Sequence, residues 1–209
     1  QDVDNDMLFV MRDRKNICNS IHLPLQAGSD RILKRMNRTY SKLEFITLVE
    51  QIKHILPGCG LSTDIIAGFP GETNQEFYET LEVMDKIKFD SAFTFKYSAR
   101  TGTKATEYSN HISDEVKQKR LKQLIETQRR HTLFRNQEEI GKTLKVLVEK
   151  KSKKSEAEWA GRTENNKWVI FPKAGTQVRD IVDVRIIGAE GVSLFGELAE
   201  LRGKPYAVV

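Results

Sequence analysis

Two short segments constrain the fold most strongly, because each joins an apolar strand pattern to a polar turn that opens a helix. They are residues 21–40, IHLPLQAGSDRILKRMNRTY, and residues 62–73, STDIIAGFPGET. Period-two alternation places Gln26 on the face opposite the aliphatic side chains of the first strand. In the second strand, Asp64 and Ile66 share one face. We expect parallel strands whose polar face holds a ligand, since buried polar side chains need partners.

Strand and helix signals alternate through the first two thirds of the chain. Ser41-Lys-Leu-Glu44 and Thr73-Asn-Gln-Glu76 fit the capping box and predict two helix starts. Phe93, Phe95 and Tyr97 alternate on one face of a strand, which predicts packing against helices. The expected order is strand 21–26, helix 42–56, strand 61–67, helix 74–87, strand 92–98 and a long helix 114–139. This alternation is typical of parallel βα units.

Three βα units cannot close a barrel, and a half-barrel leaves a strand edge unpaired. We therefore expect the other half of the barrel to lie upstream, in a longer protein of which this chain is a piece. The composition changes after Gly141, where β-branched strand patterns are separated by charged or glycine-containing turns. Residues 141–209 are expected to form a small five-stranded β-barrel of the kind that often handles nucleic acid.

Composition limits the classes of function. No apolar run approaches the roughly 20 residues of a membrane span, and the start QDVDND has no signal-peptide core. We expect a cytoplasmic protein without a membrane partner. Cys18 and Cys59 suit neither a disulfide framework nor a metal site, so no metal ligand is assigned. Residues 117–154 hold thirteen Lys and Arg against four Glu, which fits either a solvated helix face or a polyanion-binding surface.

Four stretches together resemble one enzyme family, and the resemblance continues over nearly the whole chain. They are NICNSIHLPLQAGSDRILKRMNRTY, LSTDIIAGFPGET, FKYSARTGTKA and GRTENN. The family is the MiaB-type radical S-adenosylmethionine (SAM) methylthiotransferases. The resemblance implies that residues 1–140 form the second half of an incomplete (β/α)6 radical SAM barrel and that residues 141–209 form a TRAM domain. The family's CxxxCxxC loop and its amino-terminal cysteine-bearing domain are not found in this sequence.

The resemblance also assigns three SAM-binding residues, Gln26, Arg38 and Asp64, and Ile66 joins them because it shares the strand face of Asp64. The planar fork of Arg38 matches the carboxylate of the methionine end. The Asp64 carboxylate can accept hydrogen bonds from vicinal ribose hydroxyls, and Ile66 would lie against the adenine. The alternatives are that Arg38 is a surface helix cation and that Asp64 caps a neighbouring helix.

Residues of an expected hairpin loop in the β-rich tail are candidates for RNA binding: Arg162, Asn165, Asn166 and Lys167, beside Trp159 and Trp168. Asn-Asn is ordinary turn chemistry. Amides and an arginine next to aromatic rings also suit single-stranded RNA, whose splayed bases stack on rings and hydrogen-bond along their edges. The resemblance to GRTENN favours the RNA interpretation.

The resemblance implies a tRNA-2-methylthio-isopentenyl-adenosine synthase, which methylthiolates carbon 2 of a modified adenosine next to the tRNA anticodon. Its cofactors would be SAM and two 4Fe–4S clusters with ligands outside this chain. Its partners would be the tRNA anticodon stem-loop and sulfur or electron donor proteins. We expect no catalytic residue in this chain and no activity from it alone. The alternatives are a methylthiotransferase acting on threonylcarbamoyl-adenosine in tRNA and a non-catalytic RNA-binding module.

Overall fold

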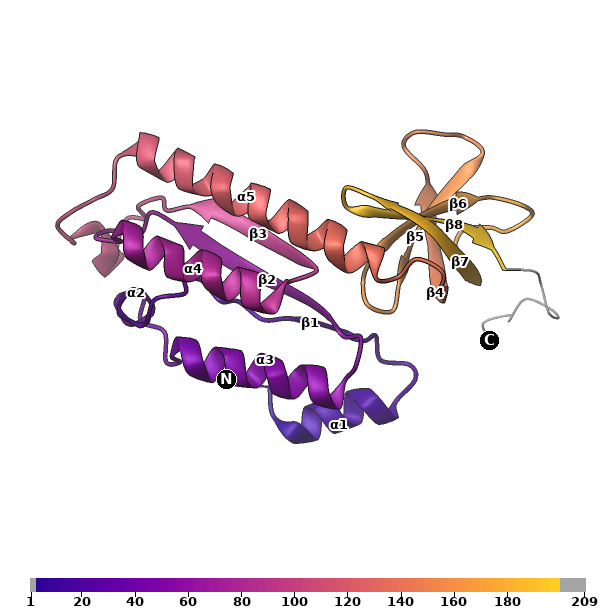
Figure 1. The fold of residues 1–209 in the computed structure, drawn as a ribbon, viewed down its shortest axis with the longest axis horizontal. Coiled ribbons are helices and arrows are strands. Elements are labelled where there is room, and N and C mark those ends of the chain that lie inside the picture. Colours follow the sequence, from indigo (N-terminus) through magenta and orange to yellow (C-terminus); the bar gives the residue numbers. More distant parts are fainter. Residues whose placement is uncertain (1–2, 200–209) are drawn as a thin grey trace.

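Figure 1 shows the computed structural model of the protein, which describes residues 3–199 as an α/β unit followed by an all-β unit. The first unit contains α1 (Asn5–Asp13), β1 (Ser20–His22), α2 (Asp30–Arg35), α3 (Lys42–Ile55), β2 (Gly60–Ala67), α4 (Asn74–Ile87), β3 (Ser91–Lys96), the 3-10 turn η1 (Lys104–Thr106) and α5 (Asp114–Gln137). The second contains β4 (Thr143–Lys151), β5 (Glu158–Thr163), β6 (Trp168–Pro172), β7 (Ile181–Glu190) and β8 (Ser193–Leu198).

The three strands of the first unit form a parallel sheet in the order β1-β2-β3. The strand expected over 21–26 is shorter than predicted, because β1 ends at His22. Pro24 follows, and proline has no N–H with which to continue a ladder. The chain nevertheless stays beside β2, since Gln26 forms a single parallel bridge with Ile65. The expected parallel βα arrangement is confirmed.

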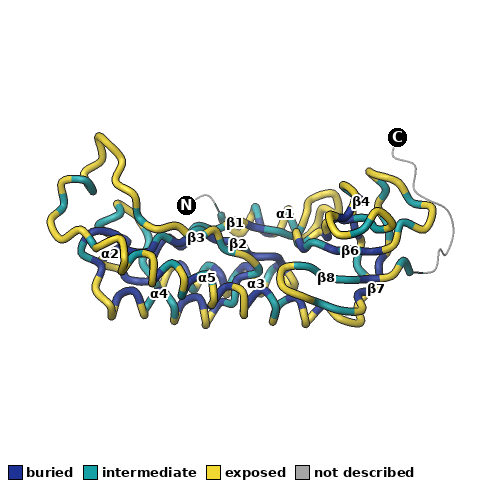
Figure 2. The backbone as a smooth tube through the Cα atoms, turned by 90° about the horizontal axis from the view of Figure 1, so that it is seen from above, coloured by how far each residue is buried: buried dark blue, intermediate teal, exposed yellow. Residues whose placement is uncertain are grey.

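The helices start where the sequence predicts. Ser41 and Thr73 each complete a capping box, so α3 and α4 begin at the following residue. The long helix α5 begins after its cap Ser113. Helix α1 was not anticipated. Helices α3, α4 and α5 lie on one face of the sheet (Figure 2), as the helices outside a parallel barrel do.

The core of the first unit lies between the sheet and these helices. It includes Leu25, Phe45, Ile52, Ile65 and Met84, all fully buried or nearly so. Alternate residues of β2 face this core, and the others point to the open side of the sheet and are half-buried.

The prediction that the aromatic residues of β3 pack against helices is wrong for two of them. Phe93 and Phe95 keep 59% and 51% of their surface exposed. They lie on the open face because the register pairs Phe93 with Asp64 and Phe95 with Ile66. Tyr97 is half-buried and packs its ring edge-on against Phe69, with 5.1 Å between the ring centroids.

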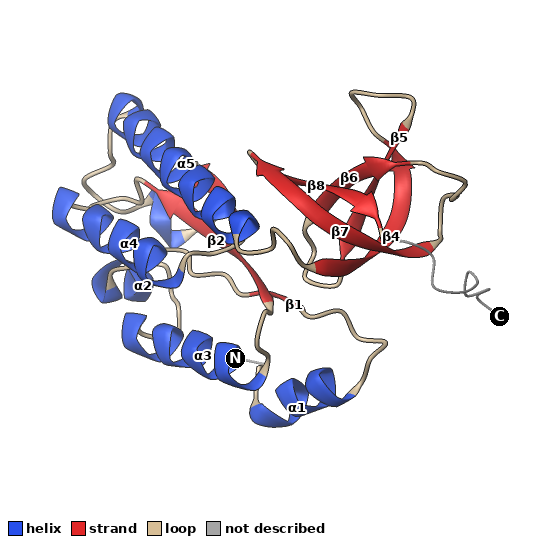
Figure 3. Ribbon diagram, turned by 45° about the vertical axis from the view of Figure 1, so that its right-hand side comes forward, coloured by secondary structure: helices blue, strands red, loops and turns tan. Residues whose placement is uncertain are grey.

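The second unit is a closed five-stranded barrel in the order β4-β5-β6-β8-β7. Its interior contains a separate apolar cluster, which includes Val146, Phe171, Val184 and Ile186. The barrel stands at the carboxyl end of α5 (Figure 3), where Gly141 donates its N–H to the Ile186 carbonyl. The expected barrel is thereby confirmed, although residues 200–209 of the predicted domain lie outside the described residues.

Candidate cofactor-binding and RNA-binding sites

The four residues predicted to bind a cofactor line one cavity at the carboxyl ends of the parallel strands. The cavity has a volume of about 940 Å³. Its lining includes Gln26, Arg38, Asp64 and Ile66, which come from three separate segments of the chain. Loops at this end of parallel strands carry the ligand sites of βα folds. The structure therefore brings together side chains that are up to 40 positions apart.

Asp64 is placed by the alternation of β2. Its neighbours Thr63 and Ile65 are buried in the core, so the Asp64 carboxylate points to the open side and keeps 29% of its surface exposed. His22 approaches it from β1, with 3.4 Å between His22 Nε2 and Asp64 Oδ2. The other ring nitrogen of His22 lies 2.9 Å from the Ser62 hydroxyl. An imidazole thus orients the carboxylate without covering it.

Gln26 occupies an unusual backbone conformation. Its φ is +64°, in the left-handed region that non-glycine residues seldom adopt. Two backbone bonds hold it there: its N–H donates to the Asp64 carbonyl, and its carbonyl accepts from the Ile66 N–H. The residue is only 6% exposed. Observed backbone strain of this kind is concentrated at ligand sites, and here it places Gln26 beside Asp64.

Arg38 is positioned by the end of α2. Asn37 adopts φ +58°, and its N–H donates to the Lys34 carbonyl, while the Arg38 N–H donates to the Leu33 carbonyl. These two bonds are the Schellman motif, which ends a helix with one left-handed residue. The chain therefore turns sharply, and the exposed Arg38 lies at the cavity rim.

The glycine turn after β2 is held by a buried ion pair. Arg120 of α5 donates to the Glu72 carboxylate at 2.6 Å, and both side chains are almost fully buried. The same carboxylate accepts the Gly68 N–H at 2.8 Å. Burial raises the pKa of Glu72, although the Gly68 N–H and Arg120 favour its charged form. The turn that forms one cavity wall is therefore fixed to α5.

The cavity contains cations that sequence reasoning did not assign to it. Besides Arg38 and Arg100, its lining includes Lys34, Arg35, Lys96 and Lys104. No local pattern places Lys34 and Arg35 in this cavity, because their contribution depends on how α2 packs beside the sheet. Tyr97 also lines the cavity. Its buried hydroxyl has no hydrogen-bond partner among the described residues.

The four residues predicted to bind RNA do not share one environment. Arg162 and Asn166 are exposed, and Arg162 Nη1 donates to the Asn166 side chain at 2.9 Å. The Arg162 guanidinium also lies over the Trp168 ring, 5.4 Å from its centroid. The second cation over that ring is Lys150, whose Nζ lies 4.3 Å from the centroid. These side chains form a basic surface next to an aromatic ring.

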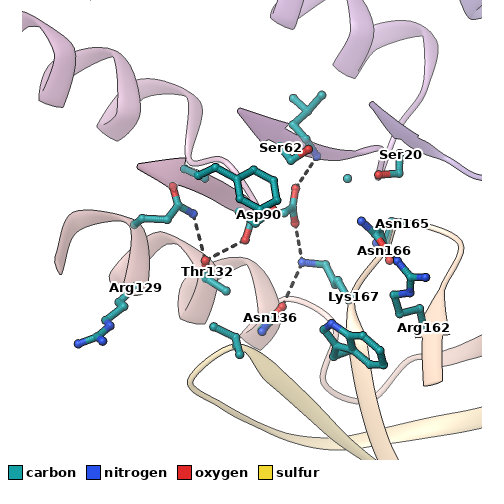
Figure 4. A pocket seen from close by; sticks show the side chains of 18 of the residues that line it. Ser20, Ser62, Asp90, Arg129, Thr132, Asn136, Arg162, Asn165, Asn166 and Lys167 are labelled. Carbon is teal, nitrogen blue, oxygen red and sulfur yellow. Dashed lines mark hydrogen bonds and ion pairs between the residues drawn. The ribbon is translucent and has the colours of Figure 1, made fainter. Parts of the chain in front are cut away.

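Asn165 and Lys167 instead turn toward the first unit. Lys167 is 6% exposed, and its ammonium contacts Asp90 and Asn136. Asn165 Nδ2 donates to Glu139 at 3.4 Å. Figure 4 shows the cavity of about 470 Å³ that these residues border between the two units. The sequence grouped all four residues as candidates for RNA binding, because nothing local reveals what packs against the turn.

Family models match both units. The radical SAM superfamily model matches residues 2–84, and the TRAM domain model matches residues 137–199. Curated relatives extend the match across the junction. A tRNA-2-methylthio-N(6)-dimethylallyladenosine synthase of Acetivibrio thermocellus is 44% identical over 198 residues, which cover 95% of this chain and 41% of the relative. The chain is a relative of the MiaB-type radical SAM enzymes.

Two further relatives match this chain with similar identity and coverage. A synthase of the same name from Christiangramia forsetii is 42% identical over 94% of this chain and 41% of its own length. One from Clostridium beijerinckii is 44% identical over 95% of the chain and 44% of its length. The chain thus spans about two fifths of the length of the curated relatives that it matches.

One solved structure supports the fold. The coproporphyrinogen III oxidase of Escherichia coli, a radical SAM enzyme, superposes with a TM-score of 0.51 at 21% identity. The match covers 63% of this chain and 30% of that enzyme. At this identity the likeness concerns the fold alone.

Radical SAM enzymes use SAM and an iron–sulfur cluster, whose usual ligands are cysteine thiolates. No group of three or more His, Cys, Asp or Glu in residues 3–199 could hold a metal ion. Cys18 is exposed, and Cys59 is buried, which raises the pKa of its thiol to about 11. Such a thiol stays protonated and is a poor metal ligand. Within the same residues, no helix has the length and apolar character needed to cross a membrane.

Proposed function

We propose that this chain supplies part of the SAM site and the RNA-binding domain of an enzyme that methylthiolates carbon 2 of isopentenyl-adenosine next to the tRNA anticodon. The observation that carries the proposal is the convergence of Gln26, Arg38, Asp64 and Ile66 on one cavity. The names of the relatives, which are tRNA-2-methylthio-N(6)-dimethylallyladenosine synthases, support the choice of substrate. A tRNA substrate also agrees with the cytoplasmic location expected from the sequence.

The side chains around the cavity fit SAM. Its volume of about 940 Å³ lies within the range of small-molecule sites. We assign the ribose hydroxyls to Asp64, the adenine to Ile66 and the methionine carboxylate to Arg38, with Gln26 beside Asp64 at the floor. The unpartnered Tyr97 hydroxyl, buried at the cavity wall, is a further donor for a polar ligand.

The described residues do not fit an iron–sulfur cluster, so we assign no reaction step to them. The resemblance implies two 4Fe–4S clusters whose cysteine ligands lie elsewhere in the enzyme, and sulfur or electron donor proteins as partners. Bound SAM supplies the radical and methyl-transfer chemistry. The residues of this chain bind and orient it: Asp64 and Arg38 would hold its two ends, which fixes the position of the sulfonium between them.

The RNA surface is proposed on the exposed side of the second unit. Arg162 and Asn166 offer donors to phosphates and base edges, and Trp168 offers a ring for stacking. Lys150 adds charge beside the same ring. Asn165 and Lys167, which the sequence also pointed to, are bound to the first unit instead. We therefore assign contact with the anticodon stem-loop to Arg162 and Asn166.

Calorimetry with S-adenosylhomocysteine tests the cofactor assignment. We expect the wild-type chain to bind and Asp64→Ala to weaken binding at least about 10-fold, because the ribose hydroxyls lose a charged acceptor. Arg38→Lys should weaken binding as well, since an ammonium cannot pair in the bidentate manner. Glu82→Ala, at an exposed position on α4, is the control. Equal affinity of the wild type and Asp64→Ala would refute the site.

Calorimetry combined with RNA binding separates the proposal from the non-catalytic alternative. An RNA-binding module would bind the anticodon stem-loop while showing no heat with S-adenosylhomocysteine in any variant. Stem-loops carrying isopentenyl-adenosine or threonylcarbamoyl-adenosine distinguish the two tRNA substrates. Preference for the first would support the proposed reaction.

A further inference from the structure

Lys167 is a buried lysine at the junction of the two units. Its ammonium lies 2.5 Å from Asp90 Oδ1 and 3.1 Å from Asn136 Oδ1 (Figure 4). The Lys167 side chain is 5% exposed and that of Asp90 is 11% exposed. Lysine is almost never this buried unless it is paired. The pair joins the turn between β5 and β6 to the residue that precedes β3 and to the end of α5.

Asp90 is fixed by groups from the first unit. Its second carboxylate oxygen accepts the Leu61 N–H at 2.9 Å, and its carbonyl accepts the Thr132 hydroxyl at 2.8 Å. Arg135 adds a second cation, with 3.6 Å between its Nε and Asp90 Oδ1. Strand β2 and helix α5 therefore hold Asp90 in place. Lys167 is the single side chain of the barrel that reaches it among the described interactions.

The backbone makes a second, uncharged contact beside this pair. A Cβ atom added to Gly60, the first residue of β2, would lie 2.2 Å from the Asn165 carbonyl oxygen. Only glycine permits so close an approach at that position. The turn that presents Asn165 is itself closed, because the Thr163 N–H donates to the Lys167 carbonyl and Asn166 adopts φ +64°. Two independent features therefore dock the same turn onto the sheet.

We propose that Lys167 is a positioning residue that locks the TRAM domain to the radical SAM sheet. Its ammonium is paired with Asp90 between the two units and is therefore not available to RNA. The lock fixes the orientation of Arg162 and Trp168 relative to the cavity that holds Asp64. Its consequence for the reaction rests on the proposed function, whereas the lock itself depends only on contacts within this chain.

Hydrogen exchange on the full chain tests the lock. Lys167→Met keeps the length of the side chain and removes the charge, which leaves the buried Asp90 carboxylate without the cation that contacts it most closely. We expect exchange of the Leu61 N–H, which donates to Asp90, to accelerate by about 100-fold or more. Lys167→Arg, which keeps the charge, should restore protection. Lys145→Met, at an exposed position of the same barrel, is the matched control.

A second measurement separates loss of docking from loss of folding. Each unit has its own apolar core, so circular dichroism of Lys167→Met should be preserved while small-angle scattering shows a larger radius of gyration. Gly60→Ala should expand the chain in the same way without a change of charge. In the double variant Asp90→Asn/Lys167→Met, the increase in the radius of gyration should be smaller than the sum of the increases in the two single variants. Neither member of the pair is then left as a buried charge facing a neutral partner.

The competing role for Lys167 is contact with RNA. In that case Lys167→Met would leave exchange and scattering equal to those of Lys145→Met, and it would lower the salt dependence of RNA binding. That result would overturn the lock. Hydrogen exchange, circular dichroism and scattering use neither SAM nor RNA. The lock can therefore be confirmed even if calorimetry refutes the proposed function, and it can fail even if calorimetry supports that function.

Discussion

At the scale of single residues, polar side chains are placed by the groups that bind them. Glu76 shows this most clearly. Its carboxylate accepts hydrogen bonds from Ser29, from Arg31 and from both the N–H and the hydroxyl of Thr73. One side chain thus joins the start of α2 to the start of α4. Helix α2 ends at Arg35, three residues before Arg38, so this carboxylate supports the wall of the candidate SAM cavity.

Glu76 should make the stability of the protein depend on pH. The hydrogen bonds from Arg31 lower the pKa of Glu76 to about 2. Because the folded-state pKa lies below the ordinary value, the stabilisation is complete above about pH 4.5 and is lost as the pH falls toward 2. We expect roughly 2–3 kcal/mol to be lost over that window. Urea unfolding at a series of pH values measures it.

Glu76→Gln provides the control for this window. The variant should be less stable than the wild type at pH 7 and should lack the part of the pH dependence that comes from this carboxyl. If the free energy of unfolding of both proteins fell equally as the pH is lowered, the pH dependence would come from other carboxylates.

At the scale of elements, α5 connects the two sites. Arg120 near its start holds the glycine turn through Glu72, and Asn136 near its end holds Lys167. The helix is polar along most of its length, so its position is set by these buried polar contacts as much as by Leu124, its one fully buried leucine. Some cations of the basic segment 117–154 therefore have a structural role, as Arg120 does. Only the exposed cations of that segment remain available to a polyanion.

Removal of Arg120 tests the role of α5. Arg120→Met leaves the buried Glu72 carboxylate without its cation, which should destabilise the fold by about 3–5 kcal/mol. Burial already raises the pKa of Glu72 in the wild type, and the variant should raise it further. A raised pKa means that stability falls as the pH rises through it. The variant should therefore be more stable near pH 5 than near pH 7.

Denaturant unfolding of Arg120→Met at both pH values makes this measurement. Adding Glu72→Gln should recover stability at pH 7, because no buried charge remains. A variant whose stability is the same at pH 5 and pH 7 would contradict this account of the pair.

At the scale of the whole molecule, the two units place their candidate sites at opposite ends of the parallel strands. The cavity lined by Asp64 lies at the carboxyl ends, and the turn of residues 163–167 contacts the amino ends at Gly60 and Asp90. If RNA binds the proposed surface of the TRAM domain and SAM binds the cavity, the RNA has to extend along the first unit to reach the cavity. The cations that line the cavity at the far end favour such a polyanion.

The exposed cations of the TRAM domain should account for part of the salt dependence of RNA binding. Lys150→Ala removes the cation that lies over Trp168. We expect a weaker affinity for an anticodon stem-loop and a slope of log K against log salt that is smaller by about 0.7–0.9. Filter binding across a salt series measures both. Lys86→Ala, on α4, is the control, and an equal slope in Lys150→Ala and the wild type would remove Lys150 from the surface.

Several parts of the fold and of the candidate site could be predicted because their causes are local. The capping boxes at Ser41 and Thr73 fix helix starts within four residues of sequence. Period-two alternation fixes which face of β2 carries Asp64. The exposed rings of Phe93 and Phe95 were predicted wrongly, because alternation shows that two residues share a face but not which face the helices cover.

The sequence by itself determined the helix starts at Ser41 and Thr73, the alternation within the strands and the change to a β-rich second unit, since each depends on residues a few positions apart. The tertiary structure alone decided that Lys167 is buried, because its partner Asp90 lies 77 positions away. It also decided that Gly60 must be glycine and that Lys34 and Arg35 line the cavity. The charge of a side chain can be read locally, but its burial and its partner depend on the packing of distant segments.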